Sequence, residues 1–225
     1  MADSVFEKDY FKNSSTYKKF SDTNCAVRRL SNYYFGLYRL IYKYYTKPGN
    51  LPINILEIGC GYSGLVNHFV SDGCNYTGLD ISRFIVDELG RRYPGITFLN
   101  HDIQLPIPVN SKFDLVVGME VLEHIPNPLA ALRNLALVLV DGGTFIASVP
   151  NPDSRIPFTN WRDDPTHVSV LTEKDWLSLF NQAGLKRTQA TTIFTLPYIW
   201  RFSKIFSKFY CVKGFGASIL LVGHK

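Results

Sequence analysis

The sequence predicts an α/β fold with a doubly wound, mostly parallel sheet covered by helices on both faces. An apolar, β-branched stretch at 53–58 runs into the glycine-rich turn 59–64 and then into helical spacing at 65–70. A second apolar stretch ends in Asp80, about 20 residues on, where nucleotide-binding sheets carry a carboxylate. Apolar runs then alternate with helical patterns along the rest of the chain, as expected for a parallel sheet.

The elements follow in order from the N-terminus. Residues 1–24 are polar and predict a loosely ordered arm, and the 3–4 spacing of apolar residues over 27–44 predicts an amphipathic helix. That helix either covers an active site or packs on the sheet. Ser82 predicts the cap of a helix over 83–92. Further strands are expected at 75–80, 96–99, 113–119, 144–149, 186–196 and 218–223.

Two more helices are marked by their ends. Asn127-Pro128 places a cap and a first-turn proline before a helix over 129–140, which Asp141-Gly142-Gly143 should stop. Thr172 and Asp175 resemble a capping box for a helix that ends at Gly184. With no repeat or low-complexity tract, we expect one domain over 1–225. It comprises an N-terminal arm and helix (1–50), a core (51–185) and a C-terminal part (186–225).

Composition narrows the class of protein. A hydrophobic content of 46% in 225 residues fits a globular domain. No apolar run reaches transmembrane length, and the N-terminus lacks the layout of a signal peptide. The cysteines have neither paired nor metal-ligand spacing: Cys25, Cys60, Cys74 and Cys211. We therefore expect a cytoplasmic protein.

The net charge of +5 is unevenly distributed. Residues 1–50 carry nine Lys and Arg against four acids, and residues 186–225 carry seven and no acid. The central region, 51–185, carries eight against fifteen. Basic ends suit nucleic acid, an anionic membrane or an acidic substrate, and they are equally consistent with solvated surfaces.

The stretch Glu57-Ile58-Gly59-Cys60-Gly61, followed by Leu79-Asp80-Ile81-Ser82, resembles the class I S-adenosylmethionine-dependent methyltransferases. The resemblance covers roughly residues 50–185. It implies seven strands, the last antiparallel, and S-adenosylmethionine as cofactor. It places Asp80 on the ribose, Asp102 on the adenine amino group and Ile103 against the adenine face. The implied cofactor-binding residues are Glu57, Gly59, Cys60, Gly61, Asp80, Ile81, Asp102, Ile103 and Met119.

Residues 113–125 resemble the fourth-strand motif of small-molecule methyltransferases, including quinone-biosynthesis O-methyltransferases. Glu120, Glu123 and His124 leave the carboxyl end of this strand together, where donor and acceptor must meet. In the quinone group such a set is associated with a divalent metal. The other interpretation is a structural Glu123–His124 pair without metal, and this is the one we predict.

Two segments are candidates for the acceptor side. The run from Pro150 to His167 follows a strand and mixes prolines with aromatic and charged residues, as functional loops do. His167 either acts as general base or fixes the loop. The order of preference for a base is His167, His124, Glu120. Residues 198–210 have an apolar face and a basic face, so we expect an amphipathic helix. This helix contacts a membrane surface, covers a hydrophobic acceptor or packs on its own domain.

The function predicted is methyl transfer to a hydroxyl group on a small-molecule, lipid-linked or saccharide acceptor. An RNA or protein methyltransferase is an alternative, although no nucleic-acid module is visible. A non-catalytic cofactor-binding partner is another. Oligomeric state stays open.

Overall fold

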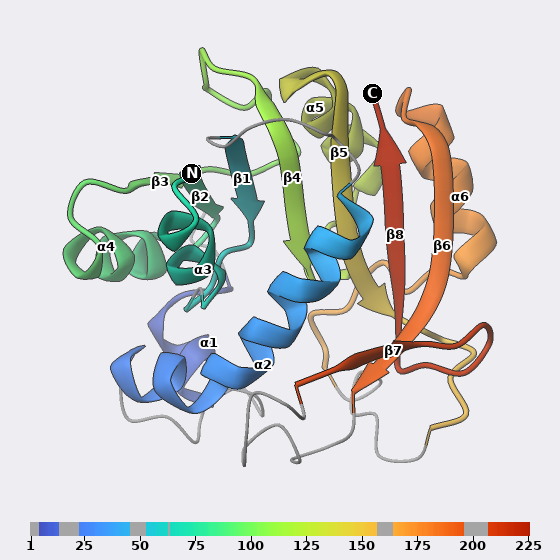
Figure 1. Cartoon of the computed structure of the whole chain (residues 1–225), viewed down its shortest axis with the longest axis horizontal. Coiled ribbons are helices and arrows are strands. Elements are labelled where there is room, and N and C mark those ends of the chain that lie inside the picture. The colour runs from blue at the N-terminus through green and yellow to red at the C-terminus, as the bar shows by residue number, and fades with distance from the viewer. Residues whose placement is uncertain (1–4, 14–22, 46–52, 63, 157–163, 196–206) are drawn as a thin grey trace.

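The computed structural model describes residues 5–13, 23–45, 53–62, 64–156, 164–195 and 207–225. Its strands are β1 (Asn54–Ile58), β2 (Asn75–Asp80), β3 (Thr97–Asn100), β4 (Phe113–Met119), β5 (Leu139–Pro150), β6 (Lys186–Thr195), β7 (Phe209–Cys211) and β8 (Ser218–His224). They form one sheet in the order β3-β2-β1-β4-β5-β8-β6-β7 (Figure 1). Strands β1 to β5 pair in parallel, which confirms the predicted doubly wound sheet.

The antiparallel strand implied by the resemblance is β8, which inserts between β5 and β6 and runs against both. The count of seven strands was wrong for this chain. The eighth strand is the short edge strand β7, which pairs with the end of β6. Three residues are too few to leave a periodic signal in the sequence.

Helices cover both faces of the sheet. They are α1 (Lys8–Asn13), α2 (Thr23–Tyr44), α3 (Leu65–Ser71), α4 (Arg83–Arg92), the 3₁₀ turn η1 (Leu122–His124), α5 (Pro128–Val138) and α6 (Glu173–Gln182). Side chains alternate along β1, so Leu56 packs in one core with α5 and α6, and Ile55 packs in another with α2 and α3. No described helix is long and apolar enough to cross a membrane.

The predicted helix caps are confirmed. The Ser82 hydroxyl accepts a hydrogen bond from the Ile85 N–H at 3.3 Å. The Thr172 hydroxyl accepts one from the Asp175 N–H, also at 3.3 Å. Asn127 caps α5, and Pro128 occupies its first turn. These caps fix where α4, α5 and α6 begin.

The predicted boundary between α5 and β5 was wrong. The residues expected to stop the helix, 141–143, lie inside β5, which begins at Leu139. The pairing jumps from Phe113–Leu139 to Leu115–Thr144, so β5 bulges here, and Gly142 has a φ of +75°. Glycines suit a bulge as well as a helix end, so the sequence does not separate the two.

The N-terminal arm and the end of the segment 198–210 also differ from expectation. Residues 8–13 of the arm form α1, and Phe11 is buried beside Cys60 and Tyr62. Residues 198–206 lie outside the described part of the chain, so the predicted helix there is not tested. Phe209 and Tyr210, at its expected end, lie in a strand. In Figure 1, α1 lies near the edge where the arrows of β1 and β4 end.

Candidate functional site at the carboxyl edge of the sheet

The turn after β1 depends on its glycines. Gly59 and Gly61 have φ values of +58° and +47°, which residues with a side chain rarely adopt. A Cβ on Gly59 would lie 2.4 Å from Val121 Cγ2. The turn therefore contacts the segment that follows β4 at a distance only glycine allows.

Asp80 ends β2 and holds this turn in place. The side chain is 6% exposed. Its Oδ2 accepts from the Gly61 N–H at 2.9 Å and its Oδ1 from the Ser82 N–H at 2.9 Å. Burial raises the pKa of Asp80 to about 6, because the charged form loses hydration. Each oxygen keeps a second lone pair for a further donor, such as a ribose hydroxyl.

Two other predicted site residues are buried next to the glycine turn. Glu57 is buried and accepts a hydrogen bond from the Tyr76 hydroxyl. Cys60 is buried, and burial raises the pKa of its thiol well above the usual range. Both side chains thus belong to the packing around the glycine turn.

The residues predicted for the adenine side lie after β3, the neighbour of β2. Asp102 is half-buried, and its Oδ1 accepts from the Gln104 N–H at 2.9 Å. Ile103 is 4% exposed and belongs to the core, whereas Ile81 is 39% exposed at the end of β2. Met119 is half-buried at the end of β4. The sheet thus brings Asp80, Ile81 and Asp102 to one edge, with Ile103 beneath.

Glu120 follows β4 in a strained conformation. Its φ of +55° is uncommon for a residue with a side chain and is characteristic of functional sites. Its Oε1 accepts from the Ser148 hydroxyl at 2.8 Å. Burial raises the pKa of Glu120. The turn aims a carboxylate across the ends of β4 and β5.

His124 is held by the loop that contains Thr166. Its Nδ1 lies 3.1 Å from the Thr166 carbonyl oxygen and 2.9 Å from the Thr166 hydroxyl. Burial lowers the pKa of His124, and the neighbouring His167 lowers it further. The imidazole is therefore neutral at neutral pH, which a proton acceptor requires.

His167 and Glu123 complete the cluster around His124. The two imidazole rings lie 4.7 Å apart, and His124 Nε2 is 3.9 Å from Glu123 Oε1. Glu123 is fully buried, and burial raises its pKa well above the usual range. Neither its carboxyl oxygens nor His167 Nδ1 has a hydrogen-bond partner among the described residues.

This cluster has the donor set of a metal site. Glu123, His124 and His167 each offer one ligand atom, and these atoms lie within 4.8 Å of one another. Imidazole nitrogen and carboxylate oxygen together suit several divalent metals. The three residues present thus fit a divalent cation, whereas the sequence analysis predicts a site without metal. Measuring turnover after removal of metal distinguishes these two interpretations.

The sequence missed the contribution of residues 6–11. The Phe6 ring lies 5.2 Å from His124, and the Tyr10 hydroxyl is hydrogen-bonded to Thr166. The Glu7 carboxylate accepts from the Arg83 and Phe84 N–H groups at 3.1 and 3.2 Å, at the start of α4. Aromatic residues at 6, 10 and 11 within a polar arm were the available signal.

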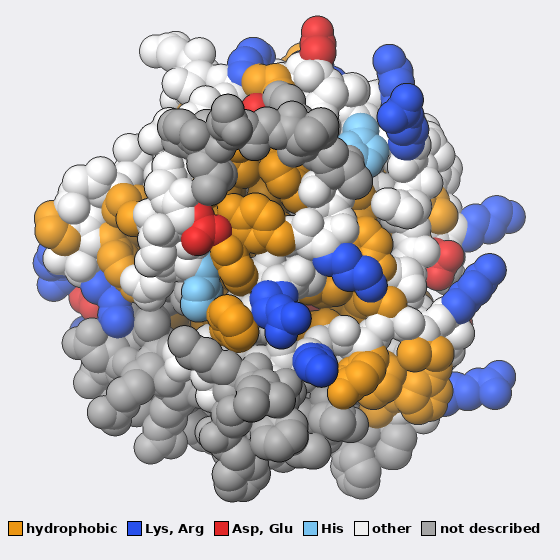
Figure 2. Space-filling model, in the orientation of Figure 1, with side chains coloured by type: hydrophobic (Ala, Val, Ile, Leu, Met, Phe, Trp, Pro, Cys, Tyr) orange, Lys and Arg blue, Asp and Glu red, His pale blue; other side chains and the backbone are white. Residues whose placement is uncertain are grey.

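Helix α2 both packs on the sheet and borders the site. Leu37, Leu40 and Ile41 are buried against the sheet, and Tyr34 covers Gly64, where a Cβ would lie 2.0 Å from its ring. Tyr33 is close enough to Glu120 for that carboxylate to raise the Tyr33 pKa, after the larger effect of burial. Figure 2 shows hydrophobic side chains gathered in the middle of this face, with Lys and Arg among them.

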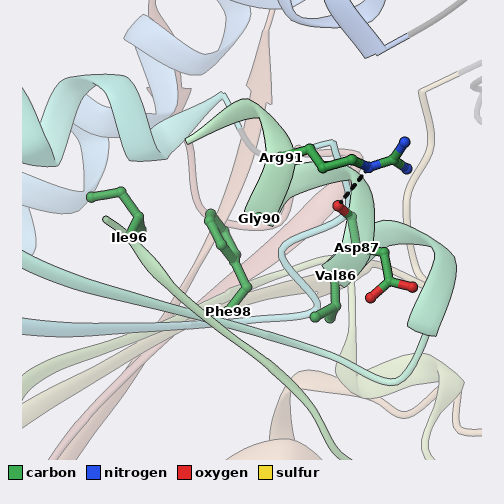
Figure 3. A pocket seen from close by; sticks show the side chains of 6 residues that line it. All are labelled: Val86, Asp87, Gly90, Arg91, Ile96 and Phe98. Atoms are coloured by element: carbon green, nitrogen blue, oxygen red, sulfur yellow. Dashed lines mark hydrogen bonds between the residues drawn. The ribbon is translucent and has the colours of Figure 1, made fainter. Parts of the chain in front are cut away.

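A separate hollow lies between α4 and β3, away from these residues. It has a volume of about 600 Å³ and is lined by Val86, Asp87, Gly90, Arg91, Ile96 and Phe98 (Figure 3). The Arg91 Nε–H donates to the Asp87 carbonyl oxygen at 3.1 Å. None of the predicted site residues lines it, so the candidate chemistry remains at the carboxyl edge.

Comparison with known proteins identifies the family. A family model described as a methyltransferase domain matches residues 30–190, which is most of the chain. The chain belongs to the class I S-adenosylmethionine-dependent methyltransferases. The match includes the glycine turn, Asp80, Asp102 and the Glu120–His124 segment, so the cofactor of this methyltransferase is S-adenosylmethionine.

Relatives extend this result. A probable S-adenosylmethionine-dependent methyltransferase of Mycobacterium tuberculosis is 28% identical over 159 residues, which are 69% of this chain and 56% of the relative. A ubiquinone biosynthesis O-methyltransferase of Coxiella burnetii is 28% identical over 102 residues, 44% of each chain. The methyltransferase thus spans about half the length of these curated relatives.

A solved structure confirms the fold. A S-adenosylmethionine-dependent methyltransferase from Archaeoglobus fulgidus superposes with a TM-score of 0.62, covering 92% of this chain and 97% of the other at 17% identity. At this identity the likeness shows the fold alone.

The described residues fit the cofactor. The glycine turn carries no side chain at Gly59 or Gly61, so its backbone can approach a ligand closely. Asp80 and Asp102 present acceptor oxygens, and the ribose hydroxyls and adenine amine are donors. The methyltransferase therefore offers the donor and acceptor groups that this ligand needs, at the edge where doubly wound sheets bind theirs.

Proposed function

We propose that the protein transfers a methyl group from S-adenosylmethionine to a hydroxyl oxygen of a small-molecule, lipid-linked or saccharide acceptor, with His124 as general base. The observation that carries the proposal is the His124 imidazole, which Thr166 orients through Nδ1 and which lies three residues after Val121, the residue that Gly59 contacts. The O-methyltransferase among the relatives supports a hydroxyl acceptor.

Contact between two segments supports a shared reaction site. Gly59 touches Val121, which lies between Glu120 and η1, so the cofactor turn and the catalytic candidates are neighbours. Aligning two reactants in this way is a large part of catalysis in any bimolecular transfer.

The hydroxyl proton needs a base, because a neutral hydroxyl is a poor nucleophile. Held by the glycine turn and Asp80, S-adenosylmethionine would supply an electrophilic methyl group, with the neutral thioether sulfur as leaving group. His124 Nε2 takes the hydroxyl proton and later releases it to water. Phe6 lies against the His124 ring and limits the access of water to it.

The choice between the two histidines rests on what holds them. The sequence favours His167, because it lies on the variable loop. The His124 ring is oriented through Nδ1 by Thr166, and an orienting third group is typical of catalytic bases. His167 Nδ1 has no such partner among the described residues, so we propose His124 as base and His167 as its neighbour.

A screen of acceptors tests this function. The protein is incubated with S-adenosylmethionine carrying a labelled methyl group and with separate pools of phenols, saccharides and polyprenyl-linked alcohols. The expected result is label on oxygen in one pool, with equal turnover after chelator treatment because the sequence predicts no metal. Label on nitrogen or in RNA would contradict the acceptor class. Turnover lost to the chelator and restored by Mg²⁺ or Zn²⁺ would contradict the metal prediction.

A further inference from the structure

The Asp-Pro-Thr-His run contains two polar residues that the proposed function has not used. Asp164 and Thr166 lie in the turn before His167, and both interact with the environment of His124. The Asp164 Oδ1 accepts from the Thr166 N–H at 2.9 Å and from the Thr166 hydroxyl at 2.5 Å. One carboxylate oxygen therefore fixes the backbone and the side chain of Thr166 together.

The Thr166 hydroxyl has a defined set of hydrogen bonds. It has one proton and two lone pairs. A carboxylate accepts hydrogen bonds, so the proton points to Asp164. A lone pair then faces His124 Nδ1, which must act as the donor.

The Thr166 carbonyl leads to the same tautomer independently. A carbonyl oxygen can only accept, and it lies 3.1 Å from His124 Nδ1. Two acceptors therefore face one ring nitrogen, and both require its proton. The neutral imidazole then carries its proton on Nδ1 and presents a bare lone pair at Nε2.

We propose that Asp164 and Thr166 are positioning residues that hold His124 as the Nδ1–H tautomer, with Nε2 free to accept a proton. The proposal rests on the role of His124 as base. Asp164 acts through Thr166 and touches neither reactant. Burial acts to raise the pKa of Asp164, but its hydrogen bonds with Thr166 and the nearby histidines together lower it, so the carboxylate stays charged.

The tautomer can be measured without knowing the acceptor. Long-range proton–nitrogen correlation spectra of the ¹⁵N-labelled full chain with S-adenosylhomocysteine distinguish protonated from bare ring nitrogens. The His124 signals are assigned by their loss in His124→Ala. In wild type we expect Nδ1 protonated and Nε2 bare. Asp164→Ala should add an Nε2–H population, because both acceptors lose their orientation.

Matched variants separate positioning from general damage. Thr166→Val keeps the carbonyl acceptor and removes the hydroxyl, so it should add a smaller Nε2–H population than Asp164→Ala, and Thr166→Ser should recover the wild-type spectrum. With the acceptor in hand, Asp164→Ala should lower kcat at least about tenfold at unchanged KM for the cofactor.

Two results would overturn the inference: a wild-type His124 with its proton on Nε2, or an Asp164→Ala spectrum identical to wild type. Failure of the proposed function is a different outcome. It would be seen as full turnover in His124→Ala, whatever the spectra show.

Discussion

His124→Ala should lower the turnover number by about 10²–10⁴-fold, the usual range for loss of a general base. The acceptor hydroxyl would keep its proton as the methyl group approaches, so the barrier to transfer rises. Cofactor affinity should stay near the wild-type value, because the described contacts of His124 are to Thr166 and to rings near it rather than to the glycine turn or Asp80. Single-turnover assays with labelled cofactor measure the rate, and calorimetry measures the affinity.

Two other histidine variants serve as controls. His224→Ala changes a histidine at the end of β8, whose Nδ1 bonds Thr144 on β5, and should leave turnover unchanged. His167→Ala should cost less than His124→Ala. A large loss in His167→Ala alone would move the base to His167, as the sequence favours. Full activity in both variants would point to Glu120 or to an acceptor that needs no base.

Asp80→Ala should weaken the binding of S-adenosylmethionine by about 10- to 100-fold, which corresponds to a lost charge-assisted hydrogen bond of about 1.5–3 kcal/mol. Two effects combine. The ribose loses its acceptor, and the Gly61 N–H loses the oxygen that holds the glycine turn in place. Titration calorimetry gives the affinity, and thermal unfolding shows whether the variant is folded.

Asp80→Asn separates charge from shape. It keeps one acceptor oxygen for the turn, so it should lose less affinity than Asp80→Ala. In wild type, affinity should fall as the pH drops below about 6, because the buried carboxyl of Asp80 becomes neutral there. Unchanged affinity in a folded Asp80→Ala protein would refute the ribose assignment.

Much of the fold was readable because its signals are local. Ser82 and Thr172 mark helix starts through hydrogen bonds within three residues, and these were predicted correctly. The start of β5 was predicted wrongly, because Gly142 and Gly143 fit a β-bulge and a helix end equally well. The placement of α1 depends on Phe11 packing against Tyr62, a contact between distant parts of the chain that no local pattern reveals.

The same division holds for the site. Strand ends placed Asp80 and Glu120 at one edge of the sheet, because carboxyl ends of parallel strands coincide. The sequence could not show that Thr166 reaches His124, since 42 residues separate them and the contact depends on the tertiary fold. It also could not show the positive φ of Glu120, which tertiary packing must hold.

A crystal structure of the protein with bound S-adenosylhomocysteine tests most directly whether cofactor and base share one edge of the sheet. We expect the ribose hydroxyls on Asp80, the adenine amino group near Asp102, and the sulfur beyond the end of β4 on the side of His124. The opposite result would be a ligand in the hollow between α4 and β3, or one at the glycine turn whose sulfur points away from His124.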